Sequence, residues 1–391
     1  MFIRKLQSTL IRDYLDELSD INQHNDPFSF IDVLNPSLTF KFCELSRDEM
    51  KNLCSLLEAS HLPFYKSGKS RNRSVIASFF NWDSMTDFFF NAENLESLYQ
   101  GLLELEQKIQ MNEWEYHIKG DRLSIKRPLI MGILNVTPDS FSDGGKFFDS
   151  DRAYNYALEM QEAGADIIDI GAESTRPGSQ PVNLEEEWQR LEPVLKKLQN
   201  AIKVPISIDT YKSDIARRAL QEGAQIINDI SGLTFDPRMS EIAAAADCPV
   251  IIMHIKGTPR NMQKNPYYKN LMEEIFKFFL DRIKFAKKAG IHQLILDPGI
   301  GFGKRFEDNF ELIRRLSEFR ILGYPIMVGP SRKSFIGKVL DIGTDDRLFG
   351  TAASVALAIS NGTNIVRVHD IHQMKQVVKI STSIENLKFF D

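Results

Sequence analysis

The chain of 391 residues carries a formal net charge of −5, and 43% of its residues are hydrophobic and 26% are charged. This composition is typical of a globular protein, and its mildly acidic balance argues against nucleic acid or a membrane surface as the main partner. The three cysteines (Cys43, Cys54 and Cys248) show no CxxC spacing, so neither a disulfide framework nor a zinc site is indicated. No apolar run approaches the ~18 residues of a membrane span, and acidic residues near the N-terminus argue against a targeting peptide. We therefore expect a cytoplasmic protein.

Residues 1–112 predict a small α+β module of unknown role. Its expected elements are a helix near 2–19, a strand at 40–45, a helix from Ser46, a strand near 74–80 and a helix containing 95–109. The helix from Ser46 is indicated by Glu49, which lies three residues on in a capping-box spacing. No catalytic constellation stands out in this module, and its basic stretch KSGKSRNR (66–73) is interpreted as a solvated loop.

From Leu129 onward, short apolar runs alternate with helical patterns. Continuous apolar strands indicate burial on both faces, and the alternation indicates parallel pairing. Eight such units in about 260 residues match the number and size of a (β/α)8 barrel, with an open doubly wound sheet as the alternative. The expected strands are 129–134, 166–171, 205–208, 225–228, 249–253, 293–297, 325–328 and 364–368. The expected helices include 152–164, 184–199, 212–222, 269–289, 307–320 and 346–361. The barrel domain is placed at residues 113–391.

Every expected strand of the barrel ends in, or runs into, polar or charged residues. These are Asn135, Glu173, Asp209, Asn228, His254, Asp297, Ser331 and Arg367. A single one of them could simply cap a helix. In a parallel barrel, however, all C-terminal strand ends meet at one rim, where the active sites of such barrels lie. The sequence therefore predicts an active site at this rim, and a hairpin over 114–127 that closes the opposite end.

Several long motifs, in this order and spacing, resemble the dihydropteroate synthase family. They are MGILNVTPDSFSDGG, DIIDIGAESTRPGSQPV, SIDTYK, INDISG, MHIKGTPRNMQ, LDPGIGFGK, VGPSRKSFIG and RVHD. The resemblance covers roughly 115–385 and not 1–112. It implies a transferase of folate biosynthesis, a sulfonamide target, that joins 6-hydroxymethyl-7,8-dihydropterin pyrophosphate to para-aminobenzoate and releases pyrophosphate.

A pterin presents a guanidine-like edge of donors beside a carbonyl group, which carboxylates and amides at the barrel mouth would match. Asp209, Asn228 and Asp297 are the candidates, and ionised carboxylates give the stronger, charge-assisted bonds. The resemblance assigns these three to the pterin, adds Lys333 for the carbonyl and a ring nitrogen, and places Met253 and Phe302 as walls of the ring. Asp229 is interpreted as a capping residue or as a support for the residues that contact the pterin.

The leaving pyrophosphate needs positive charge. Arg367 and His369 in RVHD lie where strand eight turns into the last helix, a position at which barrels of this kind often hold phosphate. The resemblance implies that Asn135 contacts a Mg²⁺ ion that the pyrophosphate also binds, and Mg²⁺ typically takes few protein ligands. It also makes Asp143 the candidate that stabilises positive charge on the pterin, with a plain turn role left open.

The para-aminobenzoate slot is expected from loops that close late, over 137–146 and 174–180, since both are rich in glycine, proline and serine. The resemblance places Phe141 and Pro177 along this slot, with contributions from Thr175 and Arg176. Ser334 is expected to receive the substrate carboxylate.

The favoured mechanism is dissociative, with Asp143, Asp297, Lys333, Arg367 and His369 as the catalytic residues and electrostatic stabilisation and orientation lowering the barrier. Two alternatives stay open: a methyltransferase of the same fold that acts on methyltetrahydrofolate, and a non-catalytic scaffold homologue. Barrels of this family are often dimers, so a homodimer also stays open.

Overall fold

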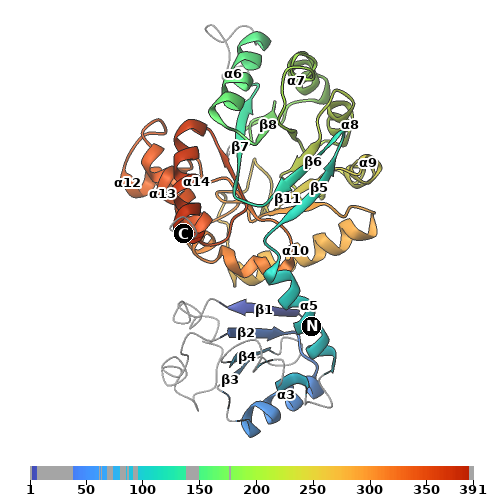
Figure 1. Ribbon diagram of the computed structural model, residues 1–391, viewed down its shortest axis with the longest axis vertical. Coiled ribbons are helices and arrows are strands. Elements are labelled where there is room, and N and C mark those ends of the chain that lie inside the picture. Colours follow the sequence, from blue (N-terminus) through green and yellow to red (C-terminus); the bar gives the residue numbers. More distant parts are fainter. Residues whose placement is uncertain are drawn as a thin grey trace. The chain divides into compact units, whose positions relative to one another are not determined.

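The computed structural model describes residues 2–6, 38–60, 62, 64–67, 74–79, 85, 88–90, 96–137, 149–175 and 178–386 (Figure 1). The chain folds into two compact units. One comprises Met1–Met111 with Ser317–Gly323, and the other comprises Asn112–Leu316 with Tyr324–Asp391. Within the described residues, no helix combines the length and the apolar character that crossing a bilayer requires.

The N-terminal unit contains a four-stranded antiparallel sheet. Its order is β1 (Phe2–Leu6), β2 (Leu38–Cys43), β4 (Ser74–Phe79) and β3 (Phe64–Ser67), and its helices are α3 (Arg47–Ala59) and α5 (Glu96–Gln110). The capping box predicted for α3 is confirmed: Glu49 N donates to Ser46 Oγ at 3.1 Å, and Ser46 N donates to Glu49 Oε2 at 2.7 Å.

The helix predicted near 2–19 is wrong over residues 2–6. These residues form β1, which pairs with β2 along its whole length. Pairing between segments distant in the sequence overrides a local helical pattern that is amphipathic but weak. Residues 7–19 lie outside the described residues.

The second unit is the predicted (β/α)8 barrel. Its eight-stranded parallel sheet has the order β12-β11-β10-β9-β8-β7-β14-β13. A parallel bridge between Leu296 and Ile326 joins the two ends, and Leu296 N donates to Pro325 O at 2.9 Å. The strands are β7 (Leu129–Asn135), β8 (Ile167–Gly171), β9 (Ile206–Asp209), β10 (Ile226–Asp229), β11 (Val250–Met253), β12 (Leu294–Asp297), β13 (Met327–Val328) and β14 (Ile365–Val368).

Helices follow the strands and surround the barrel (Figure 1). They are α6 (Ser150–Ala163), α7 (Leu184–Leu198), α8 (Ser213–Gln221), α9 (Met239–Ala246), α10 (Leu271–Lys288), α11 (Phe306–Arg314), α12 (Ser334–Leu340), α13 (Leu348–Ser360) and α14 (Ile371–Asn386). The helix predicted over 307–320 ends at Arg314 and is followed by the 3-10 helix η2 (Leu316–Leu322). The break lies at Arg315, whose N–H is shared between the carbonyls of Glu311 and Leu312, the tightening that precedes 3-10 geometry.

The hairpin predicted over 114–127 is present as β5 (Trp114–Ile118) and β6 (Asp121–Ile125), and Gly120 turns it with a φ of 83°. Its apolar face packs on residues near the beginnings of the barrel strands, such as Met131, Ile226 and Ile365. Tyr116 Oη also donates to Leu294 O at 2.6 Å. The hairpin thus closes the end of the barrel opposite the predicted site.

Candidate active site

Strand register brings the predicted strand-end residues to one level of the barrel. Asn135 on β7 pairs with Gly171 on β8, and Gly171 pairs with Asp209 on β9. Asp209 in turn pairs with Asn228 on β10, and Met253 on β11 pairs with Asp297 on β12. The polar side chains from distant parts of the sequence therefore form one row at the C-terminal rim.

Arg367 on β14 crosses the barrel to this row. Its Nη2 donates to Asp209 Oδ2 at 2.8 Å, and its Nε donates to Asp169 Oδ2 at 2.6 Å. Asn228 Nδ2 donates to the same Asp169 oxygen at 3.0 Å. Two carboxylates, one amide and one guanidinium thus form a continuous network, in which Asp169 and Asn228 are buried and Asp209 and Arg367 are half-buried.

Asp169 was not predicted as a site residue. It is fully buried in the middle of β8, and within the described part of the chain its Oδ1 has no hydrogen-bond partner. The available signal was a carboxylate inside the apolar run DIIDIG, where a buried charge must find a partner. Its contacts show that it orients Arg367 and Asn228.

Burial shifts the titration of the rim carboxyl groups. Burial raises the pKa of Asp209 to about 7, although Arg367 opposes the shift. Burial likewise raises the pKa of Asp297 to about 6, against the charges of Lys333, Lys304 and Arg367. Both groups are therefore poised to change protonation close to neutral pH, a property frequently found at functional sites.

The loop after β12 positions Asp297 and one wall of the site. Asp297 Oδ1 accepts a hydrogen bond from Gly299 N at 2.8 Å, which fixes the carboxyl group. Lys333 follows β13, the strand that adjoins β12 where the barrel closes. Its Nζ lies 4.2 Å from the centroid of the Phe302 ring. The structure thus brings the predicted pair of Lys333 and Phe302 together.

The loop after β13 has a strained backbone that several contacts hold in place. Arg332 has a φ of 54°, which is unfavourable for a residue with a side chain. Its N–H donates to Thr351 Oγ1 at 3.0 Å, Arg347 Nη1 donates to its carbonyl at 2.9 Å, and its guanidinium pairs with Asp370 at 2.5 Å. These contacts fix the turn that presents Lys333.

Ser331 contacts both the backbone and the ring of His369. Its Oγ accepts the backbone N–H of His369 at 3.2 Å and lies 3.0 Å from Nδ1 of the same residue. A hydroxyl that accepts this N–H can still donate to Nδ1, and in that arrangement the ring proton is on Nε2. Burial and the charge of Arg367 lower the pKa of His369 to about 4. The His369 ring is therefore neutral at neutral pH.

A second buried cluster closes the base of the loop between β8 and α7. Lys212 Nζ pairs with Glu173 Oε2 at 2.5 Å and with Glu187, and it donates to Val182 O at 2.6 Å. Tyr211 Oη donates to Glu173 Oε1 at 2.7 Å. The two ends of the loop are thus tied to the segment that directly follows Asp209.

The other predicted site residues differ in how exposed they are. Met253 is buried at the end of β11, Asn135 and Thr175 are half-buried, and Ser334 is exposed at the start of α12. Phe141, Asp143, Arg176 and Pro177 lie outside the described residues. Asp229 accepts from Ser231 N and Leu233 N, both at 2.8 Å, and so stabilises the turn that follows β10.

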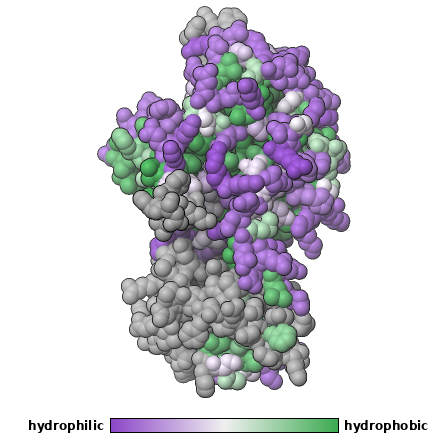
Figure 2. Space-filling model, viewed as in Figure 1, coloured by the Kyte–Doolittle hydropathy of each residue, from purple (hydrophilic) through white to green (hydrophobic). Residues whose placement is uncertain are grey.

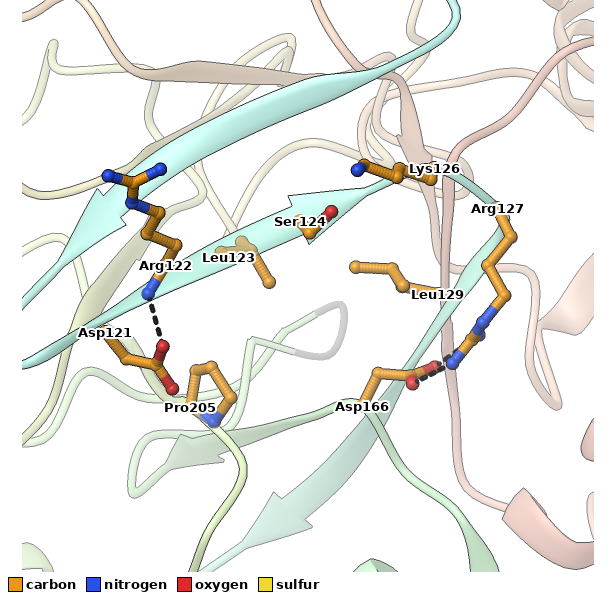
Figure 3. Close-up of a pocket in the computed structure, with 9 residues that line it drawn as sticks. All are labelled: Asp121, Arg122, Leu123, Ser124, Lys126, Arg127, Leu129, Asp166 and Pro205. Atoms are coloured by element: carbon orange, nitrogen blue, oxygen red, sulfur yellow. Dashed lines mark hydrogen bonds and ion pairs between the residues drawn. The ribbon is translucent and has the colours of Figure 1, made fainter.

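A separate cavity of about 440 Å³ lies at the other end of the barrel (Figure 3). It is lined by residues of β6 and by residues at or before the starts of the neighbouring barrel strands, including Arg122, Arg127, Asp166 and Pro205. The Arg127 guanidinium is already paired with Asp166 at 2.5 Å (Figure 3). None of the predicted site residues that the structure describes lines this cavity.

Chemically, the rim offers several hydrogen-bond acceptors, a lysine beside an aromatic ring, an arginine and a neutral histidine donor. This set can hold a flat nitrogen heterocycle and an anionic group side by side. Among its described residues there is no arrangement typical of cysteine-based nucleophilic catalysis, since all three cysteines are buried and free.

Comparisons with known proteins show the family of this chain. Residues 131–369 match the family described as pterin binding enzyme. The dihydropteroate synthase of Synechocystis sp. is 48% identical over 262 residues, which cover 66% of this chain and 91% of that protein. The structure of the Yersinia pestis dihydropteroate synthase with a sulfonamide drug gives a TM-score of 0.66 at 41% identity, covering 70% of this chain and 99% of that one. The Xanthomonas albilineans enzyme in complex with 7,8-dihydropteroate gives a TM-score of 0.64 at 34% identity, covering 70% and 99%.

A parallel barrel with this rim and these relatives defines the class of the protein: the chain belongs to the pterin binding enzyme family. Within that family its function is that of a dihydropteroate synthase, a transferase of folate biosynthesis, as the sequence predicted. The family match begins at residue 131, so residues 1–130 lie outside it.

Proposed function

We propose that the C-terminal rim joins 6-hydroxymethyl-7,8-dihydropterin pyrophosphate to para-aminobenzoate, and that the residues described above carry this reaction. The observation that supports the proposal most is the hydrogen-bonded network in which Arg367, Asp169, Asp209 and Asn228 fix one another beside Asp297. Such a network preorganises the site before any substrate arrives.

The pterin is recognised by acceptors that the network leaves available. Asn228 uses its amide nitrogen on Asp169, so its Oδ1 accepts from the ligand. Asp297 Oδ1 accepts from Gly299 N, so its Oδ2 also accepts a hydrogen bond from the ligand. Together with Oδ1 of Asp209, these oxygens match the donors of a guanidine-like edge.

The wall and the carbonyl end of the pterin are assigned to the neighbouring loops. Lys333 is held over Phe302, a geometry that positions its ammonium group for the ring carbonyl and a ring nitrogen. Met253, buried at the end of β11, is assigned to the opposite wall.

Pyrophosphate is bound by Arg367 and His369. Arg367 uses Nε and Nη2 on the two carboxylates, so its Nη1 is assigned to a phosphate oxygen. His369 contributes an Nε2–H donor because Ser331 occupies Nδ1. A neutral donor still stabilises a polyanion, though less than a cation does.

A Mg²⁺ ion fits this site through Asn135. This residue is half-buried at the end of β7, and no described residue hydrogen-bonds to its side-chain amide. Among the described residues there is also no group of three or more carboxylate, histidine or cysteine ligands. One amide oxygen suffices for Mg²⁺ that keeps waters and phosphate oxygens. When bound, the ion supplies positive charge to the leaving group.

The amine slot is assigned to the loops after β7, β8 and β13. Thr175 and Ser334 are the described members, and Ser334 is exposed enough to meet the substrate carboxylate with its hydroxyl. Phe141, Arg176 and Pro177 complete the proposed slot. Asp143 is assigned to stabilising positive charge on the pterin.

The reaction is then dissociative. The bond between the pterin methylene carbon and oxygen breaks, and its electron pair leaves with pyrophosphate, which Arg367 and His369 hold. The electron-rich pterin shares the resulting positive charge beside Asp209 and Asp297. The amine of para-aminobenzoate forms the new carbon–nitrogen bond and loses a proton. The chain contributes orientation and electrostatic stabilisation.

A product assay tests the proposal. The full chain, both substrates and Mg²⁺ should give 7,8-dihydropteroate and pyrophosphate. Asp297→Asn and Lys333→Ala should each lower kcat/KM by about a hundredfold or more, with circular dichroism unchanged. The surface variant Asp214→Asn is the control. Near-normal turnover by both site variants would overturn the assignment, methyl transfer from methyltetrahydrofolate would favour the methyltransferase, and no turnover at all would favour a scaffold.

A homodimer in the cytoplasm completes the proposal. Exposed apolar side chains gather on α13 and α14, where Phe349 is 84% exposed and Leu357, Ile380 and Ile384 are also exposed. Figure 2 shows a hydrophobic area over the part of the barrel where Figure 1 labels α12 and α13. Light scattering should give a dimer that Phe349→Glu weakens. A wild-type monomer would contradict it, and fractionation of the source cells would test the location.

A further inference from the structure

Lys304 is a buried lysine that the chemistry above does not use. It follows the glycine-rich segment GIGFG between β12 and α11 and is only 2% exposed. Burying an ammonium group is unfavourable unless other groups replace its water. Its surroundings show which groups do so.

Acceptors surround its Nζ. It donates to the carbonyl oxygens of Phe302 at 3.0 Å, Gly299 at 3.2 Å and His254 at 3.3 Å, and it lies 2.9 Å from His254 Nδ1. Lysine has three donors and no acceptor, so the four acceptors share three N–H groups, and Nδ1 accepts when the ring proton is on Nε2. The ammonium group thus bridges the end of β11 and the loop after β12.

These two segments approach unusually closely. A Cβ added to Gly299 would lie 2.0 Å from His254 O, and one added to Gly303 would lie 2.4 Å from Lys256 O. Only glycine allows such backbone contact. Carbonyl oxygens that converge in this way repel one another, and the ammonium group of Lys304 offsets that repulsion.

The bridged segments carry the residues assigned to the pterin. Met253 directly precedes His254, while Asp297 ends β12 and Phe302 lies in the loop that follows it, on the other side of the bridge. The two segments are also joined by His254 N, which donates to Asp297 O at 2.9 Å.

Lys304 also contributes charge behind Asp297. Burial raises the pKa of Asp297, and the cations that oppose this are Lys333, Lys304 and Arg367. Burial lowers the pKa of Lys304 itself to about 7, and Asp297 opposes that shift, so Lys304 is mostly charged in the acid range where Asp297, with a pKa of about 6, titrates. The other charged groups that influence Lys304 are Asp308, Lys333 and Lys256.

We propose that Lys304 is a positioning residue for the pterin, a role that rests on the function proposed above. Its ammonium group holds the segments of Met253 and Phe302 at a fixed spacing and supplies positive charge behind Asp297. Loss of Lys304 therefore weakens recognition of the pterin substrate and leaves recognition of para-aminobenzoate largely intact.

Three variants of the full chain test this role. Lys304→Met removes the charge and the donors, Lys304→Arg keeps the charge, and Lys379→Met on the exposed side of α14 is the matched control. Steady-state kinetics gives kcat and both KM values, and kcat/KM for the pterin substrate is measured against pH. Lys304→Met should raise the KM for the pterin substrate about tenfold or more and that for para-aminobenzoate less than about twofold.

The pH profile separates charge from spacing. In Lys304→Met the acid limb should move to higher pH, because Asp297 loses a neighbouring cation. In Lys304→Arg the limb should stay near its wild-type position, although the larger head group still raises the KM. If Lys304→Met does not fold, Lys304→Gln takes its place, since its amide keeps two N–H donors without the charge.

The inference is overturned if the uncharged variant matches Lys379→Met in both KM and pH profile, or if it raises both KM values equally. Wild-type and Lys379→Met proteins that form no product would instead overturn the proposed function. The two failures are therefore distinguishable.

Discussion

Replacing Asp169 by asparagine tests whether the centre of the barrel depends on a buried ion pair. The carboxylate is fully buried, and its Oδ2 accepts from Arg367 Nε at 2.6 Å and from Asn228 Nδ2 at 3.0 Å. Asparagine keeps the shape but loses the charge, and removing one partner of a buried pair typically costs about 3–5 kcal/mol of unfolding free energy. Because Asp209 still pairs with Arg367, we expect a loss near the lower limit, about 3 kcal/mol.

Urea unfolding followed by circular dichroism measures this loss. The control is Asp214→Asn, whose carboxylate pairs with the exposed Arg238 at 3.0 Å. A surface pair of this kind contributes about 1 kcal/mol or less. If the transition state loses the same free energy of stabilisation, kcat/KM for the pterin substrate should fall about a hundredfold in Asp169→Asn. A variant as stable as the control and as active as wild type would show that neither stability nor activity depends on the ion pair between Asp169 and Arg367.

Ser331→Ala should lower kcat about tenfold, because His369 loses the hydroxyl that fixes its tautomer, and an unchanged kcat would contradict that assignment. Gly299→Ala should lower the free energy of unfolding by about 2 kcal/mol or more in urea titrations, since the added Cβ would lie 2.0 Å from a carbonyl oxygen. Gly120→Ala, where φ is positive but nothing lies within 4 Å, should cost about 1–2 kcal/mol, and a cost there equal to or above that of Gly299→Ala would argue against the packing account. Because burial raises the pKa of Asp297 to about 6, protonation below that pH removes an acceptor. The kcat/KM for the pterin substrate should therefore fall about tenfold per pH unit there, and a flat profile from about pH 8 to about pH 5 would exclude this role.

The barrel and its rim could be predicted because each strand carries its own signal. An apolar run that stops at Asn135, Asp209 or Asp297 marks both the strand and its C-terminal end. In a parallel barrel those ends meet at one rim, so topology alone brings distant residues together. The capping box at Ser46 was predictable for a similar reason, since it depends only on a local spacing.

Asp169, Ser331 and Lys304 show what the sequence could not reveal. In strands buried on both faces, side chains show no alternation, so nothing in DIIDIG indicated that Asp169 points toward Arg367. The tautomer of His369 depends on a serine 38 residues away in the sequence. The partners of Lys304 are mostly backbone carbonyl groups, which every residue possesses, so no side-chain pattern in the sequence indicates its role.

The N-terminal error has a different origin. The segment at Phe2–Leu6 has a pattern compatible with a helix, but its conformation is decided by β2, which lies more than thirty residues further along the chain. Strand pairing of this kind depends on a partner that local periodicity does not contain.

A crystal structure of the full chain soaked with 7,8-dihydropteroate would show where the pterin binds. We expect the pterin ring within hydrogen-bond distance of Asn228 and Asp297 and beside Phe302, at the C-terminal ends of the strands. A ring bound in the cavity near Arg122 at the opposite end of the barrel, or away from these residues altogether, would contradict this expectation.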